Sequence, residues 1–372
     1  MQAVILAGGF GTRLRPLTST RPKPLIPFAN EPFLLHMLRQ LASSGFNDVV
    51  LSTMYLPEAF DELIPAARKV GLEVVLSSED TPMGTSGAVK RLSHLLTDTF
   101  MVFNGDILVD LDIQKLVALH RERRAAASLA LVRVPDPSAF GLVPIDGDGR
   151  VQAFLEKPGP DEEAWATDLI NAGVYVLEPS VLEHVPAGQP SSFERHLFPS
   201  LLASGAPVYG YELQGYWRDL GTPIAYLSAQ ADLLEGRLSL PISATERGRG
   251  RWFSDAAEVE EGAVLRGPVL IGASARVERE GRIFGPSVLG PGAVVVGGAR
   301  VERSVLLAGA KVERGGKVSD SIVGAGVVVG SGAVVSDGAI LGDGVVIEEG
   351  NVLAGGVRVA PGVHLPPGAI RV

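Results

Sequence analysis

Four cations near the N-terminus stand out against their surroundings. The first thirty residues contain no Asp or Glu, so this segment carries +4 in a chain of formal net charge −9, which leaves −13 for the remainder. The four cations are Arg13, Arg15, Arg21 and Lys23. Positive charge gathered in one segment, against the sign of the whole chain, favours an anionic ligand. We therefore expect this segment to bind an anion.

A glycine-rich turn precedes these cations. Residues 3–7 form an apolar run typical of a buried strand, and Gly8, Gly9 and Gly11 follow it. Open α/β sheets bind phosphates at such a turn, because backbone N–H groups without side chains can approach phosphate oxygens. A transit peptide is also rich in Arg and poor in acids, but a buried strand that enters a tight turn is not expected of one.

Two common phosphate-binding motifs do not fit this turn. The dinucleotide fingerprint needs a third glycine. The segment in which that glycine would have to lie begins with Thr12 and Arg13 and does not contain it. The P-loop needs a Gly-Lys-Ser/Thr sequence, which does not follow here. Pro16 keeps a long helix from starting in the segment. We predict instead that Arg13 and Lys23 clamp a polyphosphate through their side chains, with the prolines beside Lys23 stiffening its position.

A candidate carboxylate follows another apolar run. Asp106 comes soon after residues 99–103, which places it at the carboxyl end of a predicted strand, where open α/β sheets hold their ligands. Magnesium is commonly held by one or two carboxylates together with substrate phosphates. Asp106 is thus a candidate metal ligand, and the alternative is an Asx turn or helix cap. Asp110 and Asp112 are expected to be caps.

The elements that must position these groups form a layered α/β domain. Helical apolar spacing, as in residues 34–42 and 113–120, alternates with strand-like runs up to about residue 250, which predicts a largely parallel sheet. The predicted strands are residues 3–7, 49–52, 74–76, 100–103, 128–132 and 174–177.

The last third of the chain has a different period. Of 45 glycines, 24 lie in residues 252–372, and apolar residues recur every six positions from Val323 to Leu365. A block with the same step ends at Leu307, and the phase shifts between residues 311 and 321. Six-residue periodicity with glycine-rich corners predicts a parallel β-helix. The expected organisation is a catalytic domain at 1–236, a linker at 237–251 and the β-helix at 252–372.

Composition excludes several classes of protein. The 372 residues include no cysteine, so disulfides, thiolate metal sites and cysteine nucleophiles are ruled out. No stretch reaches about 18 apolar residues, and no secretory signal is visible. The net negative charge disfavours nucleic acid and anionic membranes as partners. We expect a cytoplasmic protein.

A longer string carries a family resemblance. Residues Leu6 to Thr18 (LAGGFGTRLRPLT), continuing to Pro22-Lys23-Pro24, resemble the signature of the sugar-1-phosphate nucleotidyltransferases, also called nucleotide-sugar pyrophosphorylases. Further matching strings are Asn104-Gly105-Asp106, Glu156-Lys157-Pro158, Asn171 to Tyr175 and Trp217 to Pro223. The resemblance covers residues 1–235 and implies a Rossmann-like domain with a mainly parallel mixed sheet, followed by a left-handed parallel β-helix of hexapeptide repeats.

The resemblance also implies an activity and its residues. A phosphate oxygen of a sugar 1-phosphate attacks the α-phosphorus of a nucleoside triphosphate and releases pyrophosphate. Arg13, Lys23 and Asp106 are the implied catalytic residues, and Asp106 and Asp219 the implied ligands of Mg²⁺. The implied nucleotide-binding residues are Leu6, Ala7, Gly8, Gly9, Gly11, Thr12, Arg13, Lys23, Glu79, Pro82, Gly84 and Thr85. The implied sugar-phosphate-binding residues are Gly141, Glu156, Lys157 and Asn171, and Glu194 belongs either to that pocket or to a surface ion pair.

The choice of base and sugar rests on residues 79–88. This segment resembles the Gly-Thr-Ala-Gly form of mannose-1-phosphate guanylyltransferases, with Ser86 in place of alanine. Guanine presents N–H donors, so Glu79 or a backbone carbonyl near Pro82 is the expected acceptor. We favour GTP and mannose 1-phosphate. Glucose 1-phosphate with UTP, dTTP or ATP is the alternative.

Other functional classes remain as alternatives. Hexapeptide β-helices also house acyltransferases that use a histidine, and His364 is the only histidine after residue 196, predicted to point outward. A non-catalytic subunit that binds nucleotide-sugar is a further alternative, although Arg13, Lys23 and both aspartates are present. For the β-helix itself we expect a role in homo-oligomer assembly.

Overall fold

The computed structural model describes residues 1–110, 112–134, 136–138, 140–156, 167–212 and 214–372. The chain forms two compact units. Unit 1 consists of residues 1–9 and 37–217, and unit 2 of residues 10–36 and 218–372. The segment that carries the N-terminal cations therefore belongs to the same unit as the C-terminal repeats. The domain boundaries given above remain a prediction from the sequence.

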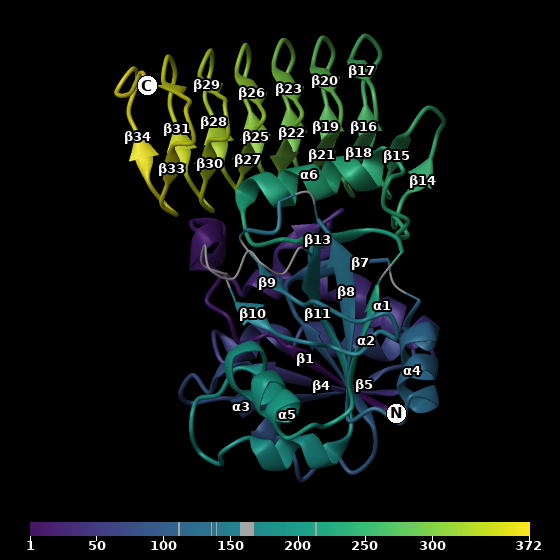
Figure 1. Cartoon of the computed structure of the whole chain (residues 1–372). Coiled ribbons are helices and arrows are strands. Elements are labelled where there is room, and N and C mark those ends of the chain that lie inside the picture. The colour runs from purple at the N-terminus through teal and green to yellow at the C-terminus, as the bar shows by residue number, and fades with distance from the viewer. Residues whose placement is uncertain (111, 135, 139, 157–166, 213) are drawn as a thin grey trace. The chain divides into compact units, whose positions relative to one another are not determined.

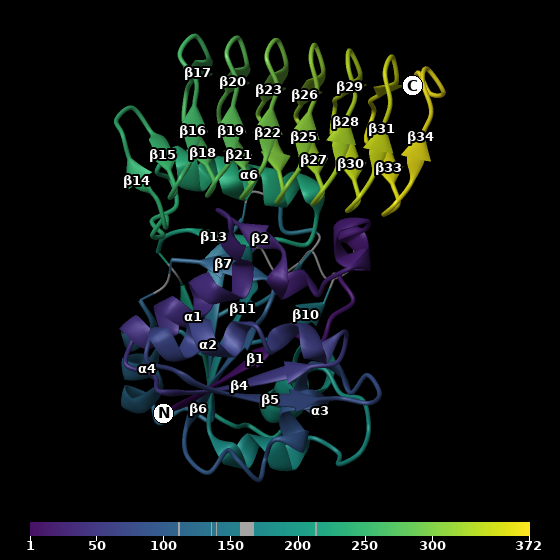
Figure 2. The ribbon, with the colours of Figure 1, turned by 180° about the vertical axis from the view of Figure 1, so that it is seen from behind.

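The main sheet of unit 1 is mixed, with a parallel centre. Its strand order is β10-β9-β11-β6-β1-β4-β5, and β8 pairs with both β11 and β12. Strands β6, β1, β4 and β5 run parallel, whereas β11 is antiparallel to β6. Figure 2 shows β1, β4 and β5 side by side. The bounds are β1 (Gln2–Leu6), β4 (Asp48–Thr53), β5 (Glu73–Ser78), β6 (Phe100–Asn104), β8 (Ala127–Arg133), β9 (Gly141–Leu142), β10 (Leu155–Glu156), β11 (Leu169–Leu177) and β12 (Val208–Glu212).

Burial explains why these residues form the centre of a sheet. Ala3, Val4 and Ile5 of β1 are fully buried, as expected of a strand covered on both faces. The predicted strands and the two predicted helices are confirmed within a few residues. The α-helices of the described residues are α1 (Phe33–Ser43), α2 (Leu63–Lys69), α3 (Gly84–Arg91), α4 (Ile113–Glu122), α5 (Phe198–Ala203) and α6 (Pro223–Leu234), with short strands β2 (Pro27–Phe28), β3 (Glu31–Pro32), β7 (Ile107–Val109) and β13 (Trp217–Asp219).

Unit 2 contains the predicted parallel β-helix, built of three sheets of stacked short strands (Figure 1). The first sheet consists of β14 (Thr245–Glu246), β15 (Arg251–Phe253), β18 (Val269–Ile271), β21 (Ser287–Leu289), β24 (Val305–Leu306), β27 (Ile322–Val323), β30 (Ile340–Leu341) and β33 (Arg358–Val359). The second consists of β16 (Glu258–Val259), β19 (Arg276–Val277), β22 (Val294–Val295), β25 (Lys311–Val312), β28 (Val328–Val329), β31 (Val346–Ile347) and β34 (His364–Leu365). The third consists of β17 (Val264–Arg266), β20 (Arg282–Phe284), β23 (Arg300–Glu302), β26 (Lys317–Ser319), β29 (Val334–Val335) and β32 (Val352–Leu353).

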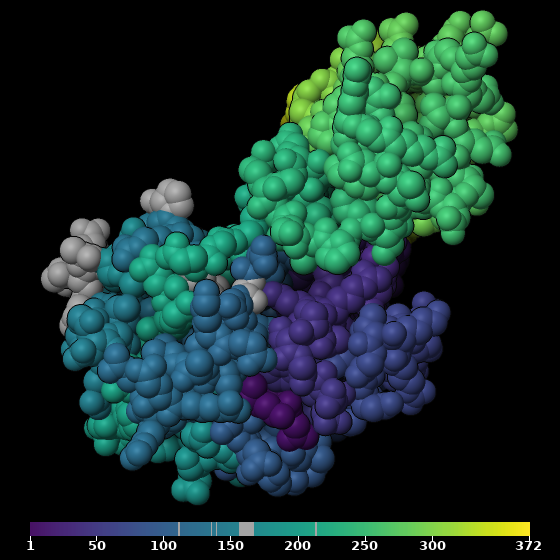
Figure 3. Space-filling model, turned by 90° about the vertical axis from the view of Figure 1, so that its right-hand side faces the viewer, coloured from purple at the N-terminus to yellow at the C-terminus, as the bar shows by residue number. Residues whose placement is uncertain are grey.

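The six-residue period marks the side chains that fill the β-helix. Val323, Val329, Val335, Leu341 and Ile347 are all fully buried in one apolar core. Figure 3 views the β-helix from the end that carries its first coils. Aliphatic side chains in register on successive coils therefore hold the repeats together.

The six-residue repeat shifts its phase because two coils are one residue shorter than the coil before them. Ile271 pairs with Leu289, a step of 18 residues, whereas Leu289 pairs with Leu306 and Leu306 with Val323, two steps of 17. The expectation that Leu307 continues the inward series was wrong by one residue, because Leu306 takes that place in the core cluster. The two shorter coils produce the interruption that the sequence shows between residues 311 and 321.

Helix α6 lies along the β-helix within unit 2, and Figures 1 and 2 show it crossing the first sheet near β18 and β21. Thr222 caps it, with its side chain accepting a hydrogen bond from Ala225 N, and Pro223 occupies its first turn. The residues just before this helix, from Arg218 onward, are those that resemble the family's last motif. No helix among the described residues is long and apolar enough to span a membrane.

Candidate active site

The cation-bearing loop of unit 2 is folded back on itself. Residues Thr12–Leu14 form a single 3₁₀ turn, η1, in which Leu14 N donates to Gly11 O over 2.9 Å. Gly11 has φ +58°, and a Cβ there would lie 2.9 Å from Thr18 Cγ2. Thr18 Oγ1 also donates to Gly11 O at 2.9 Å. A glycine is thus required at Gly11 by both backbone conformation and space.

Arg13 and Lys23 converge on one carboxylate in unit 2. Arg13 Nη2 lies 3.6 Å from Asp219 Oδ2, and Lys23 Nζ lies 3.6 Å from Asp219 Oδ1. The Lys23 side chain is 9% exposed and that of Arg13 is 65% exposed. A Cβ at Gly221 would lie 2.4 Å from Arg13 Nη2, so this glycine makes room for the guanidinium. The role of Gly221 was not predicted, although it lies in a quoted motif.

The donors fit a metal ion that arrives with its substrate. Asp219 is a single carboxylate beside two cations, and the described residues contain no group of three or more acidic or histidine side chains suited to a metal. Magnesium needs few protein ligands when phosphate oxygens and waters complete its octahedron. A resident metal held by the protein alone would need more donors. The residues present therefore suit a divalent ion bound jointly with a triphosphate.

In unit 1 the strings that begin at Leu6 and at Asn104 meet at the carboxyl ends of β1 and β6. Leu6 on β1 pairs with Asn104 on β6, and Gly105 N donates to Leu6 O at 2.9 Å. The partly exposed Asp106 follows directly. Beyond β1, Gly8 is partly exposed and Gly9 exposed, with open space where a side chain of Gly9 would lie. The backbone of this turn is thus accessible to a ligand.

Glu79 is occupied by contacts within the protein. Its Oε1 accepts a hydrogen bond from Ser52 Oγ at 2.9 Å and its Oε2 accepts one from Met83 N at 3.0 Å. The residue is only 8% exposed. Each carboxylate oxygen already has a donor, so this carboxylate fixes the shape of the 79–83 loop. Glu79 is already engaged within the protein. The backbone carbonyl near Pro82 is therefore the more suitable of the two acceptors expected for guanine.

The departure from the family pattern at Ser86 has a structural explanation. Ser86 is fully buried at the start of α3, and its Oγ donates to Ser191 Oγ at 2.8 Å. Ser191 N donates to Met83 O at 2.8 Å, so residues 83–87 are bound to the segment around Ser191. A buried hydroxyl needs such a partner. The serine pair thus leaves neither buried hydroxyl without a partner.

The predicted sugar-binding residues lie on adjacent strands. Glu156 on β10 pairs with Gly141 on β9, and Leu142 on β9 pairs with Ile170, the neighbour of Asn171 on β11. The Asn171 side chain accepts from Gly173 N at 3.0 Å and donates from Nδ2 to Tyr175 OH at 2.6 Å. Lys157 lies outside the described residues.

Glu194 links the predicted base and sugar segments. Its Oε1 accepts from Tyr175 OH at 3.3 Å, and its Oε2 lies 2.6 Å from Ser192 Oγ and 3.4 Å from Thr85 Oγ1. Burial, followed by the negative charges of Glu194 and Asp106, raises the pKa of Tyr175 well above its usual value. Tyr175 therefore stays a neutral donor, and Glu194 is part of this network rather than a surface ion pair.

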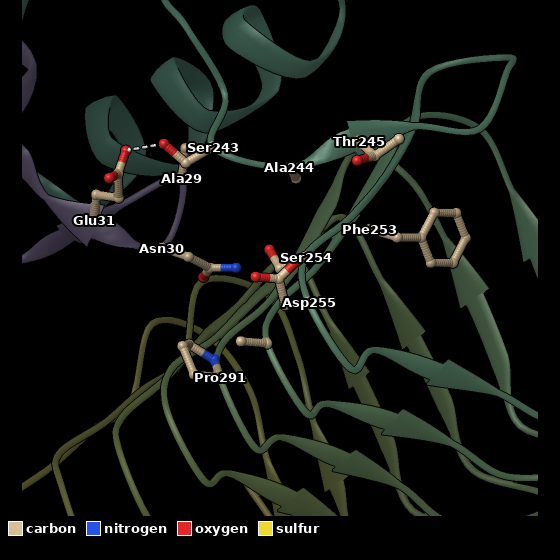
Figure 4. A pocket seen from close by; sticks show the side chains of 11 residues that line it. Ala29, Asn30, Glu31, Ser243, Ala244, Thr245, Phe253, Ser254, Asp255 and Pro291 are labelled. Carbon is tan, nitrogen blue, oxygen red and sulfur yellow. Dashed lines mark hydrogen bonds between the residues drawn. The ribbon is translucent and has the colours of Figure 1, made fainter.

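Two features lie apart from these residues. A cavity of about 410 Å³ in unit 2 is lined by residues 29–31, 243–245 and 253–255 with Ala273 and Pro291, and its charged side chains are acidic (Figure 4). Acidic walls oppose phosphate binding. His364 is exposed on β34, 2.5 Å from Glu348 Oε1, which confirms its predicted outward direction.

The comparisons with known proteins agree with these motifs. The family model described as Nucleotidyl transferase matches residues 2–236, and the model described as GMPPB C-terminal domain matches residues 265–365. A mannose-1-phosphate guanylyltransferase of Mycobacterium tuberculosis is 43% identical over 84% of this chain and 83% of its own. A UTP–glucose-1-phosphate uridylyltransferase of Synechocystis is 33% identical over 87% of each chain.

A solved structure is also similar to this chain. The crystal structure of HddC from Yersinia pseudotuberculosis complexed with GMP-PN is 29% identical, covers 61% of this chain and 97% of that chain, and has a TM-score of 0.53. Motifs, fold and relatives all lead to one assignment: the chain belongs to the nucleotidyl transferase family and is a nucleotidyltransferase.

Proposed function

We propose that the protein makes GDP-mannose from GTP and mannose 1-phosphate. A phosphate oxygen of mannose 1-phosphate forms a bond to the α-phosphorus of GTP, the bond from that phosphorus to the bridging oxygen breaks, and pyrophosphate leaves with the electron pair. The convergence of Arg13 and Lys23 on Asp219 carries the proposal, because it gathers two cations where a triphosphate needs neutralising. The identity of 43% with a mannose-1-phosphate guanylyltransferase supports the choice of substrates.

Each cation has a defined task in this reaction. The nucleophile is already an anion, so no general base is needed and the difficulty is to bring two negative substrates together. Arg13, largely exposed at the loop surface, stabilises the departing pyrophosphate. Lys23, nearly buried, contacts the triphosphate near the α-phosphate. Lys157 holds the phosphate of the sugar, and Gly141, Glu156 and Asn171 contact the sugar ring and its hydroxyls.

We assign the divalent ion as Mg²⁺, with Asp106 and Asp219 as the protein residues that would hold it. When bound, the ion supplies positive charge to the triphosphate. Asp219 has a second task in the free protein, since it lies within 3.6 Å of both Arg13 and Lys23 and offsets their charges. The backbone N–H groups of residues 8–12 then cradle the phosphates, as bare glycine turns do.

Guanine recognition rests on the 79–85 loop. Glu79 holds this loop through Ser52 and Met83, which leaves the backbone near Pro82 to accept the N–H donors of guanine. The GMP in the name of the HddC ligand fits this choice of base. The 33% identity to a uridylyltransferase favours UTP and glucose 1-phosphate as the second candidate pair.

Assembly and location complete the proposal. The first and second sheets of the β-helix end at β33 and β34. Each of these two strands has one strand neighbour among the described residues. Such edges can pair with another copy of the chain, so we infer a homo-oligomer formed through the β-helix. We place the protein in the cytoplasm, where nucleotide-sugar precursors are made.

The test is pyrophosphate release from GTP and mannose 1-phosphate, with and without Mg²⁺. We expect release that requires the metal and falls about 10²-fold or more in both Asp106→Asn and Asp219→Asn. Asp112→Asn is the matched control, because Asp112 caps α4 by accepting from Lys115 N and asparagine caps equally well. Full activity in either site variant, or release without any divalent ion, would contradict the proposal.

A further inference from the structure

The loop that carries Arg13 and Lys23 is held by side chains of the β-helix, within unit 2. Arg358, the first residue of β33, donates from Nη1 to Arg13 O at 3.0 Å and to Arg15 O at 3.1 Å. These carbonyls lie at the end of the η1 turn, where backbone oxygens lack partners in the turn itself. A guanidinium is suited to such a place because it is a charged donor with several N–H groups.

A second anchor lies on the neighbouring coil. Arg21 Nη2 lies 2.5 Å from Asp343 Oδ2, which also accepts from Thr20 Oγ1 at 2.8 Å. The other oxygen of Asp343 accepts from Ala325 N at 2.8 Å, on the preceding coil. The side chains of Arg21 and Asp343 are 26% and 20% exposed. A backbone N–H of the preceding coil therefore orients the carboxylate that binds the loop.

The two anchors lie close in sequence to the predicted clamps. Arg358 binds the carbonyl of Arg13 itself, and Asp343 binds a side chain two residues before Lys23. In Figures 1 and 2 the purple segment after residue 10 lies beside the ends of β30 and β33. Neighbouring coils are joined by the pairing of Ile340 with Arg358, so both anchors belong to one stack of paired coils.

We propose that Asp343 and Arg358 of the β-helix are positioning residues for nucleotidyl transfer, which hold the 12–23 loop so that Arg13 and Lys23 meet the triphosphate. This inference rests on the proposed function, and it gives the β-helix a part in the reaction in addition to assembly. Neither residue touches substrate. Their effect passes through the loop backbone and through Arg21.

The first experiment separates kcat and KM for each substrate in Arg358→Gln and Asp343→Asn of the full chain. Misplacing a positioned group by about 1 Å can cost about 10²-fold in rate, so we expect kcat/KM for GTP to fall about 10- to 100-fold. Binding of mannose 1-phosphate should change less than threefold. Asp320→Asn is the matched control, because Asp320 pairs with Arg303 elsewhere on the β-helix.

A charge exchange provides a second, independent test. Arg21→Asp and Asp343→Arg each place like charges together, and the double variant restores an ion pair of opposite direction. We expect each single variant to lose about 10-fold or more in kcat/KM for GTP and the double variant to recover most of that loss. Equal losses in all three variants, with an unchanged melting temperature, would overturn the proposal.

Amide hydrogen exchange separates this inference from the proposed function, since it needs no turnover. We expect faster exchange of the amides of residues 12–23 in Arg358→Gln and Asp343→Asn than in Asp320→Asn, even if the native protein uses another substrate pair. Unchanged exchange in that loop would overturn the positioning role whatever the activity. Faster exchange across the whole β-helix would also overturn it, because the variants would then act through general destabilisation.

Discussion

At the scale of single residues, the arrangement of charge around Asp219 is the feature from which the chemistry follows. Two cations lie 3.6 Å from one carboxylate in unit 2, and under the proposed function this carboxylate offsets their charges until a triphosphate binds beside them. Lys23 is the more buried of the two cations. Its charge is screened less by water, so its removal should have the larger effect.

Lys23→Met should remove a charged contact that strengthens as the transition state forms. We expect kcat/KM to fall about 10²- to 10³-fold, corresponding to about 3–4 kcal/mol of transition-state stabilisation. Lys115→Met is the control, since Lys115 is 66% exposed on α4 and pairs with Asp112. Steady-state kinetics measure kcat/KM for both variants. If the Lys23 variant is as active as the Lys115 variant, Lys23 does not act in the site.

Gly221→Ala tests the positions of Arg13 and Asp219 without changing their charges. The new Cβ would lie 2.4 Å from Arg13 Nη2 and 2.8 Å from Asp219 Oδ2, so both side chains must move. We expect a loss of about 10-fold in kcat with little change in melting temperature. Gly147→Ala is the control, because nothing lies within 4 Å of its Cβ position. A large fall in melting temperature for Gly221→Ala alone would show that the glycine serves the fold rather than Arg13.

At the scale of elements, two polar side chains fix local structure. Asn351 takes an inward position that the repeat elsewhere gives to valine or alanine, and it is fully buried. Its Nδ2 donates to Glu348 O and Pro366 O, each at 2.9 Å, and its Oδ1 accepts from Ile370 N at 2.8 Å. One side chain thus ties the C-terminal segment onto the last coil.

Asn351→Val should therefore destabilise the end of the β-helix. The valine fits the repeat, but it leaves backbone groups of residues 348, 366 and 370 without their partner, at a cost of about 1–3 kcal/mol. Hydrogen exchange should show faster exchange of the Ile370 amide. Ser336→Ala, at an exposed contact of the same β-helix, is the control. An unchanged unfolding free energy for Asn351→Val would contradict this account.

In unit 1, Glu178 joins α4 to the end of β11. His120 Nε2 lies 3.0 Å from its Oε1, and Thr99 Oγ1 donates to the same oxygen at 2.7 Å. Burial raises the pKa of Glu178, but the hydrogen bonds with His120 and Thr99 outweigh burial and leave the pKa below its usual 4.5. A lowered pKa in the folded state stabilises the fold above about pH 4.5, and this contribution is lost as the pH falls below it.

Glu178→Gln should accordingly reduce the acid sensitivity of the fold. The variant loses the pH-dependent contribution, so its unfolding free energy should fall less steeply below about pH 4.5 than that of the native protein. Glu183→Gln, at an exposed position, should leave the native profile unchanged. Chemical unfolding at a series of pH values measures both profiles. Parallel profiles for native protein and Glu178→Gln would count against the linkage.

At the scale of the whole molecule, the sequence predicts local patterns better than long-range contacts. The sequence predicts the strands, the helices, the β-helix and the motifs around Arg13 and Asp106. Each of these features depends on residues that are close together in the chain. The contact of Arg358 with Arg13 joins residues 345 apart. Its register depends on the length of every coil in between, including two coils of 17 residues.

The same limit applies to the site. The family resemblance implied Asp219 only as a metal ligand, and its contacts with Arg13 and Lys23 are seen in the structure alone. Glu79 was predicted as a possible acceptor for guanine, yet Ser52 and Met83 occupy its oxygens. Polar networks of this kind depend on side-chain geometry, which residue spacing does not encode.

The most direct test of the central claim is a competition. The native protein with Mg²⁺ is given GTP, UTP, ATP and dTTP in equal amounts, together with equal amounts of mannose 1-phosphate and glucose 1-phosphate, and the nucleotide-sugars are identified by mass. The account predicts GDP-mannose as the dominant product, formed in equal amount with pyrophosphate. UDP-glucose as the dominant product, or no nucleotide-sugar from a folded protein, would contradict it.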